Sequence, residues 1–175
     1  MNIIFKLIII FLFLENAAAR ESGETEITTE DGIEVYQNEK YYILKKNVKI
    51  ISDKFILNAD NIKVNFDKSL YDIDSLEAKG NIFFKSNESK IQSIDEILNL
   101  RVQSEDIRIE GIKSKLLTEE MEMYSDGFIE VNNSSGVFNI KGPNSKLINN
   151  DIIIKAENIN GILTNNLNAK EITFL

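Results

Sequence analysis

The sequence contains no cysteine, no histidine and no tryptophan, and it has a single proline. Without cysteine and histidine, the chain cannot build a zinc or iron–sulfur site of the Cys/His type, a disulfide, a cysteine nucleophile or a Ser-His-Asp triad. Much of conventional enzymology is therefore excluded. We expect a protein that is not an enzyme and that has neither a metal site nor a cofactor.

Basic residues are also in short supply. Lysine and arginine number 20 against 28 aspartates and glutamates, which gives a net charge of −8. This balance argues against nucleic acid as a partner, because phosphate binding needs a basic surface. The chain is nevertheless long and apolar enough to fold, since 43% of its 175 residues are hydrophobic. We therefore expect one domain with a core of its own.

The N-terminal segment is typical of a secretory signal peptide over residues 1–19. Lys6 precedes the apolar run Leu7–Leu14, and Ala17-Ala18-Ala19 supplies small residues for cleavage after Ala19. The alternative is a retained membrane anchor, but a helix that crosses a bilayer needs about 20 apolar residues. Export predicts a periplasmic location. A polar lead at residues 20–31 follows.

Most of the remaining chain alternates apolar and polar residues with a period of two. Ile62-Lys63-Val64-Asn65-Phe66 and Ile107-Arg108-Ile109-Glu110 are examples, and Gly, Asn, Asp or Ser bound each short stretch. This pattern predicts an all-β fold of many short antiparallel strands with one face buried. Only Ile91–Val102 has a helix-like spacing of apolar residues, and there too we favour a strand.

A short tetrad repeats along the chain. Ala59-Asp60-Asn61-Ile62 recurs as Ser104-Glu105-Asp106-Ile107 and as Ala156-Glu157-Asn158-Ile159. Apolar residues occupy odd positions before Asp60 and even positions after it, as a bulge or corner in a strand would produce. We therefore expect Asp60, Glu105 and Glu157 to be corner residues that face water. The alternative is a carboxylate pair, Asp60 with Glu105, as in a glycosidase.

A second element interleaves with the tetrad, as Lys46-Asn47-Val48 and Gly80-Asn81-Ile82. The order of these units, with the opening Gly32–Tyr36, resembles the OstA-like family of lipopolysaccharide export proteins, although Lys46 stands where the family usually has glycine. The resemblance implies an open, flattened β jelly roll of ~14–16 short stacked antiparallel strands, here a single domain over residues 32–175. Such modules are joined end to end and carry lipopolysaccharide acyl chains in an apolar groove.

Among the family's members, the sequence is most similar to the soluble periplasmic bridge protein. The resemblance thus implies a role in outer-membrane biogenesis of a Gram-negative cell. Its implied partners are lipopolysaccharide, the OstA-like domains of the inner- and outer-membrane export proteins, and further copies of itself. Two alternatives stay open: the inner-membrane-anchored relative with an uncleaved N-terminal helix, and a structural β-solenoid on the cell surface. The unequal repeat spacing disfavours the solenoid.

The inward apolar residues are the predicted lipid-binding set, and the strands near the two ends are the predicted interface. An acidic chain must hold an anionic lipid by its tails, and each buried CH₂ contributes about 0.8 kcal/mol. An unprotected edge strand favours pairing with another chain. The predicted lining is Val48, Ile50, Phe55, Leu57, Ile62, Val64, Phe66, Leu76, Ile82, Phe84, Ile107, Ile109, Met121, Met123, Ile129 and Val131; the predicted interface is Ile33, Val35, Ile172, Phe174 and Leu175.

Overall fold

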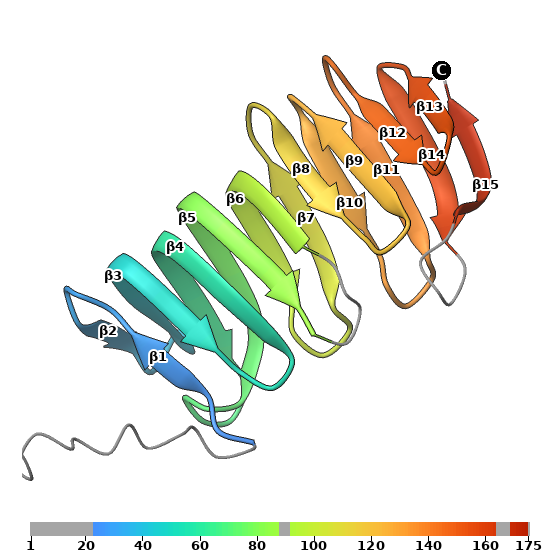
Figure 1. Cartoon of the computed structure of the whole chain (residues 1–175). Coiled ribbons are helices and arrows are strands. Elements are labelled where there is room, and N and C mark those ends of the chain that lie inside the picture. The colour runs from blue at the N-terminus through green and yellow to red at the C-terminus, as the bar shows by residue number, and fades with distance from the viewer. Residues whose placement is uncertain (1–22, 88–91, 164–168, 175) are drawn as a thin grey trace, which may run out of the picture.

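The computed structural model describes residues 23–87, 92–163 and 169–174, and they form one antiparallel sheet of fifteen strands (Figure 1). The all-β fold and the expected number of strands are confirmed. The strands are β1 (Glu26–Thr28), β2 (Ile33–Tyr36), β3 (Tyr41–Ile51), β4 (Phe55–Phe66), β5 (Ile73–Ser86), β6 (Gln92–Arg101), β7 (Asp106–Glu110), β8 (Ser114–Leu117), β9 (Met121–Ser125), β10 (Phe128–Val131), β11 (Val137–Lys141), β12 (Lys146–Asn149), β13 (Ile152–Lys155), β14 (Asn158–Leu163) and β15 (Ala169–Phe174).

Strands β3 to β6 are long because each one bends and continues. The pairing register jumps between Lys45 and Val48 in β3, and again further along β4 and β5. Such jumps mark β-bulges, which bend a strand and turn its faces over. The two halves of each long strand therefore belong to two different layers, and strand β6 pairs with β7 through one half and with β8 through the other.

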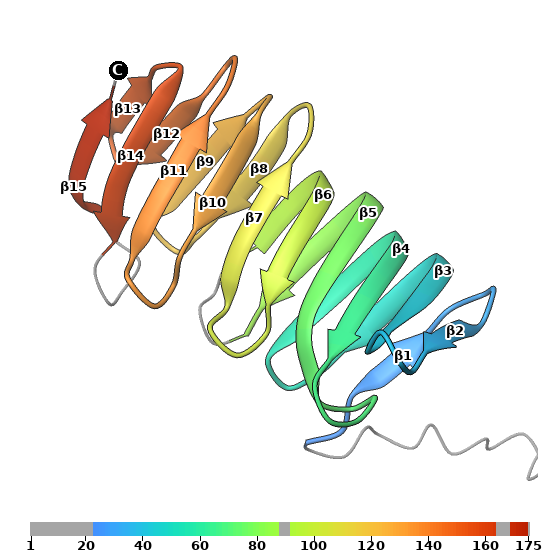
Figure 2. The same cartoon turned by 180° about the vertical axis from the view of Figure 1, so that it is seen from behind.

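The two layers face each other along the length of the molecule. Layer A consists of β2, β7, β10, β11, β14 and β15 with one half of each long strand, and layer B consists of β1, β8, β9, β12 and β13 with the other halves. Figure 1 shows layer B in front, and Figure 2 shows layer A in front.

We call the side where strands pass between the layers the corner. We call the opposite side, where hairpin turns join neighbouring strands of one layer, the seam. Its turns include residues 52–54, 67–72, 102–105 and 132–136.

Asparagines with a left-handed backbone build the corner. Three of them have φ between 48° and 57°, a region that asparagine tolerates better than most residues. Each donates a side-chain hydrogen bond to an acid that precedes it in the chain, and these bonds lower the pKa of the Glu30 and Asp126 carboxyls. The pairs are Asn47 with Glu30 (2.6 Å), Asn81 with Asp60 (2.9 Å) and Asn144 with Asp126 (2.6 Å).

The space between the layers is filled by apolar side chains. In β4, Phe55, Leu57 and Ala59 are buried before the bend, and Ile62 and Val64 are buried after it. The predicted switch of phase at Asp60 is therefore confirmed. Outward positions are polar along most strands, so the sheet has one apolar face and one hydrated face.

Two strands lie where the sequence predicted a polar lead or left the choice between strand and helix open. Strand β1 lies within residues 20–31, where we expected a polar lead, and it pairs with the second half of β3. Residues 92–101 form strand β6, which confirms the preference for a strand over a helix there. The predicted signal peptide lies outside the described residues. Within the described ranges, no helix could span a membrane.

Candidate functional site

The predicted lipid-lining residues all lie in the interior between the layers. All sixteen belong to the buried core, and Ile50, Leu57, Ile62, Val64 and Leu76 have no exposed area. Their inward orientation follows from the alternation of the strands, since successive side chains point to opposite faces. That these side chains contact a lipid stays a prediction.

Further buried residues extend this interior and were missed from the sequence. They come mainly from the region after residue 90, where the family motifs fade but the alternation continues. Counting alternate positions there would have found them. The set is Tyr42, Leu44, Ala59, Ala78, Leu98, Leu100, Leu116, Phe138, Ile140, Leu147, Ile159 and Leu163.

The apolar interior reaches the N-terminal end of the sheet without a cover. Strand β2 pairs with β3 and forms the edge of layer A. Ile33 and Val35 lie opposite the buried residues Leu44 and Tyr42, so they are on the inward face, yet they are 53% and 46% exposed. These two predicted interface residues thus continue the interior to an open edge.

At the C-terminal end, two strands form the edges. Strand β15 ends layer A; Ile172 there packs partly buried against the core, and the backbone of Phe174 pairs with Ile159. Leu175 lies outside the described residues. Strand β13 ends layer B, and its residues Ile152 and Ile153 are 63% and 60% exposed. Strand β13 was not among the predicted interface segments.

The three acids of the repeated tetrad do not share one environment. Asp60 is at the corner, where its carboxylate accepts a hydrogen bond from Asn81, and Glu157 is exposed. The expectation that Glu105 is a corner residue facing water is wrong. Glu105 lies in the turn between β6 and β7, at the seam, and only 8% of it is exposed. Its local sequence matches the tetrad, but the chain there closes a hairpin within layer A.

This placement bears on the glycosidase alternative. Asp60 and Glu105 lie at opposite ends of the layer A half-strands, one at the corner and one at the seam. Two carboxylates that flank a glycosidic bond must face one cleft, and these two do not. Among the described residues, no group of three or more acidic side chains is placed to hold a metal ion.

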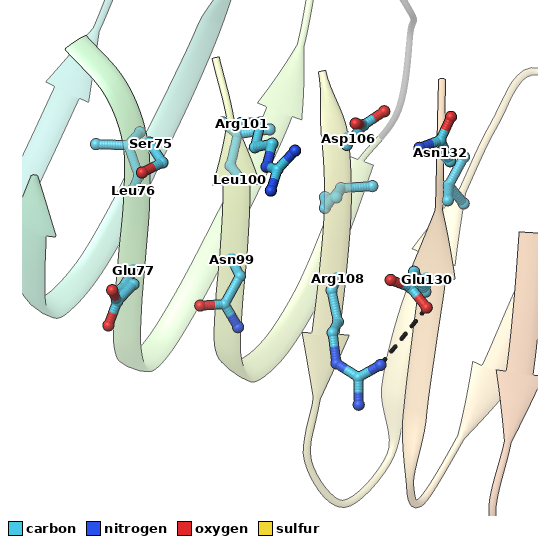
Figure 3. Close-up of a pocket in the computed structure, with 12 residues that line it drawn as sticks. Ser75, Leu76, Glu77, Asn99, Leu100, Arg101, Asp106, Arg108, Glu130 and Asn132 are labelled. Carbon is cyan, nitrogen blue, oxygen red and sulfur yellow. Dashed lines mark ion pairs between the residues drawn. The ribbon is translucent and has the colours of Figure 1, made fainter. Parts of the chain in front are cut away.

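The outer face of layer A carries a shallow hollow of about 430 Å³. Figure 3 shows Glu77, Asn99, Arg108 and Glu130 in a row across β5, β6, β7 and β10. The Arg108 guanidinium is neutralised by Glu110 at 2.7 Å and Glu130 at 3.6 Å. The row is therefore an exposed polar face in which each charged side chain lies beside a charge of opposite sign, Glu77 beside Lys63 and Arg108 beside Glu110 and Glu130.

Basic residues near the N-terminal edge are also paired. Lys45 contacts Glu34 at 2.5 Å and lowers the pKa of that carboxyl, and Lys46 contacts Glu30 at 3.2 Å. Both pairs are exposed, and exposed ion pairs contribute little to stability. The charges of Lys45 and Lys46 are thus matched by carboxylates.

The two-layered sheet can be compared with known proteins. No model of a known protein family matches the sequence, and no curated protein is similar to it in sequence. A crystal structure does match: LptH from Pseudomonas aeruginosa, described as the LptA-homologous periplasmic component of the conserved lipopolysaccharide transport device. The TM-score is 0.54 at 8% sequence identity, over 77% of this chain and 83% of LptH.

The two proteins share a fold. At this level of identity, the likeness concerns the architecture and not the activity. The resemblance expected from the interleaved motifs is thereby confirmed for the fold.

Proposed function

We propose that this protein is a periplasmic component of lipopolysaccharide transport, which binds acyl chains between its two layers and is joined end to end with like modules. The observation that carries the proposal is the continuous apolar interior, from Ile33 at one edge to Ile172 at the other, in a fold shared with LptH. A ligand held by its tails needs apolar surface and no catalytic group.

The charge of the chain supports tail recognition over head-group recognition. The net charge is −8, and the basic side chains Lys45, Lys46 and Arg108 are matched by carboxylates. An anionic lipid therefore gains little from charge attraction. A buried chain of a dozen carbons contributes on the order of 10 kcal/mol before entropy costs, at about 0.8 kcal/mol per CH₂.

The edges support assembly with like modules. Among the strands that the structure describes, β2 at the N-terminal end and β13 and β15 at the C-terminal end have one unpaired side. Exposed inward-facing residues such as Ile33 and Val35 would be covered by a second module that continues the sheet. Pairing of this kind is β-augmentation, and a head-to-tail contact of unlike edges can extend without closing.

Site-specific photo-crosslinking tests lipid binding directly. A photoreactive phenylalanine analogue replaces either Phe66, which is buried between the layers, or Lys63, which lies on the outer face of the same strand. Both proteins are produced in cells that make lipopolysaccharide. We expect a lipid adduct at Phe66 and none at Lys63. Equal labelling at the two positions would contradict an interior binding site.

A further inference from the structure

Glu105 is unusual for a glutamate both in its backbone conformation and in its burial. It closes the turn 102–105 with a left-handed backbone, φ 54°, where glycine or asparagine would fit with less strain. Its side chain is not in solvent but points into the molecule, with 8% of the residue exposed. Buried glutamates are rare unless they are paired. Departures of this kind concentrate at functional sites.

The carboxylate meets a small polar group at the seam. Ser86 Oγ, at the end of β5 in layer B, donates a hydrogen bond of 3.0 Å to Glu105 Oε2. This bond joins a turn of layer A to a strand of layer B. Ser93 on β6 lies diagonally across from Ser86, because Ser93 is paired with Phe84. Ser86 and Ser93 are both buried and both on the inward face.

Two atoms of this group lack partners. Glu105 Oε1 and Ser93 Oγ are buried, and neither has a hydrogen-bond partner among the described residues. A buried polar atom without a partner is strongly unfavourable, and most such atoms in proteins are satisfied by protein, water or ligand. Around them the interior is formed by Phe55, Phe84 and similar residues, which offer no hydrogen bond.

We propose that Glu105, with Ser93, forms a polar subsite inside the apolar interior that binds a hydrogen-bond donor carried by an otherwise apolar acyl chain. A carboxylate oxygen accepts hydrogen bonds, and a serine hydroxyl donates or accepts them. The matching group is a hydroxyl or an amide N–H attached to the chain. This inference rests on the proposed function, because the ligand reaches the subsite only if acyl chains enter between the layers.

The test compares two probes that differ by one hydroxyl group. The affinities of tetradecanoate and 3-hydroxytetradecanoate are measured by displacement of a fluorescent fatty acid from the full protein. One additional hydrogen bond to an acceptor that is otherwise unpartnered predicts that wild type prefers the hydroxylated probe by about tenfold. Glu105→Leu, which removes both acceptor oxygens, should abolish this preference, measured as the ratio of the two affinities. Ser93→Ala should reduce the preference.

Each outcome has a distinct meaning. Equal affinity of wild type for both probes overturns the subsite and leaves the proposed function standing. A preference that survives in both Glu105→Leu and Ser93→Ala places the hydroxyl elsewhere and also overturns the assignment. Failure of wild type to bind either probe contradicts the proposed function itself. Thermal unfolding checks that the variants are folded; because Glu105→Leu also removes the hydrogen bond from Ser86, some loss of stability in this variant does not count against the subsite.

Discussion

The N-terminal edge offers a sharp test of end-to-end assembly through the change Ile33→Lys. Ile33 lies on the inward face of the edge strand β2 and is 53% exposed. A matched control exists in Ile94, which is also 53% exposed but lies on β6, with β5 paired on one side and β8 on the other. Ile94→Lys changes the net charge by the same amount and leaves both edges as they are.

The magnitude follows from the area that assembly would cover. Full burial of an isoleucine side chain contributes about 1.5–3 kcal/mol, so covering the exposed half of Ile33 contributes about 1 kcal/mol per junction. The lysine adds the cost of bringing an ammonium group to an apolar edge, although its long stem lets the charge reach water. A total of about 1–2 kcal/mol weakens association by roughly 5- to 30-fold.

Sedimentation equilibrium of the two variants and wild type measures this effect. Wild type should associate in a concentration-dependent manner, Ile94→Lys should match it, and Ile33→Lys should need a roughly tenfold higher concentration. Circular dichroism checks that all three proteins are folded. Association of Ile33→Lys equal to that of wild type would refute an N-terminal junction. Equal weakening of both variants would show that added charge, and not the edge, controls association.

Denaturant unfolding checks three further predictions. Leu76→Ala should lower the free energy of unfolding by about 2–5 kcal/mol, because Leu76 is fully buried. Gly80→Ala should cost about 1 kcal/mol more than Gly32→Ala. Both glycines have φ near 80°, but a Cβ at Gly80 would displace the Asp60 side chain from its hydrogen bond with Asn81, whereas at Gly32 it meets open space. Burial raises the pKa of Tyr42 to about 12, so between pH 10 and 12 the unfolded chain loses this proton while the folded chain keeps it. The free energy of unfolding should therefore fall by about 1.4 kcal/mol per pH unit over this range because of Tyr42. Tyr42→Phe should remove this contribution to the slope.

Alternation of apolar residues predicted most of the fold, because burial between two layers acts on each strand separately. Ile62, Val64 and Phe66 are buried as their spacing indicates, and the odd-to-even switch located the bend at Asp60. Where a strand has one hydrated face and one buried face, the alternation in its own sequence indicates which residues are buried.

The environment of Glu105 could not be predicted in the same way. Its tetrad has the same residue types as the one at Asp60, but these four residues alone do not determine whether the chain bends between the layers or closes a hairpin. That depends on the partners of β6, which pairs with β7 along one half and β8 along the other. The exposed edge at β13 was missed for a similar reason, since an edge is defined by the absence of a neighbour in the assembled sheet.

The interior between the layers is tightly packed, which limits how an acyl chain could enter it. Leu57 and Leu76 have no exposed area, so a chain must replace contacts between the layers and cannot simply fill a space beside them. The strand-to-strand hydrogen bonds run along each layer, so parting the layers at the seam would disturb side-chain packing and the Ser86–Glu105 hydrogen bond but leave the ladders intact. At the corner, the long strands pass from one layer to the other and join the layers covalently. If the proposed function holds, contacts with an incoming chain would replace the side-chain contacts that are lost, so that one apolar face would serve both as the core of the fold and as the surface for a lipid.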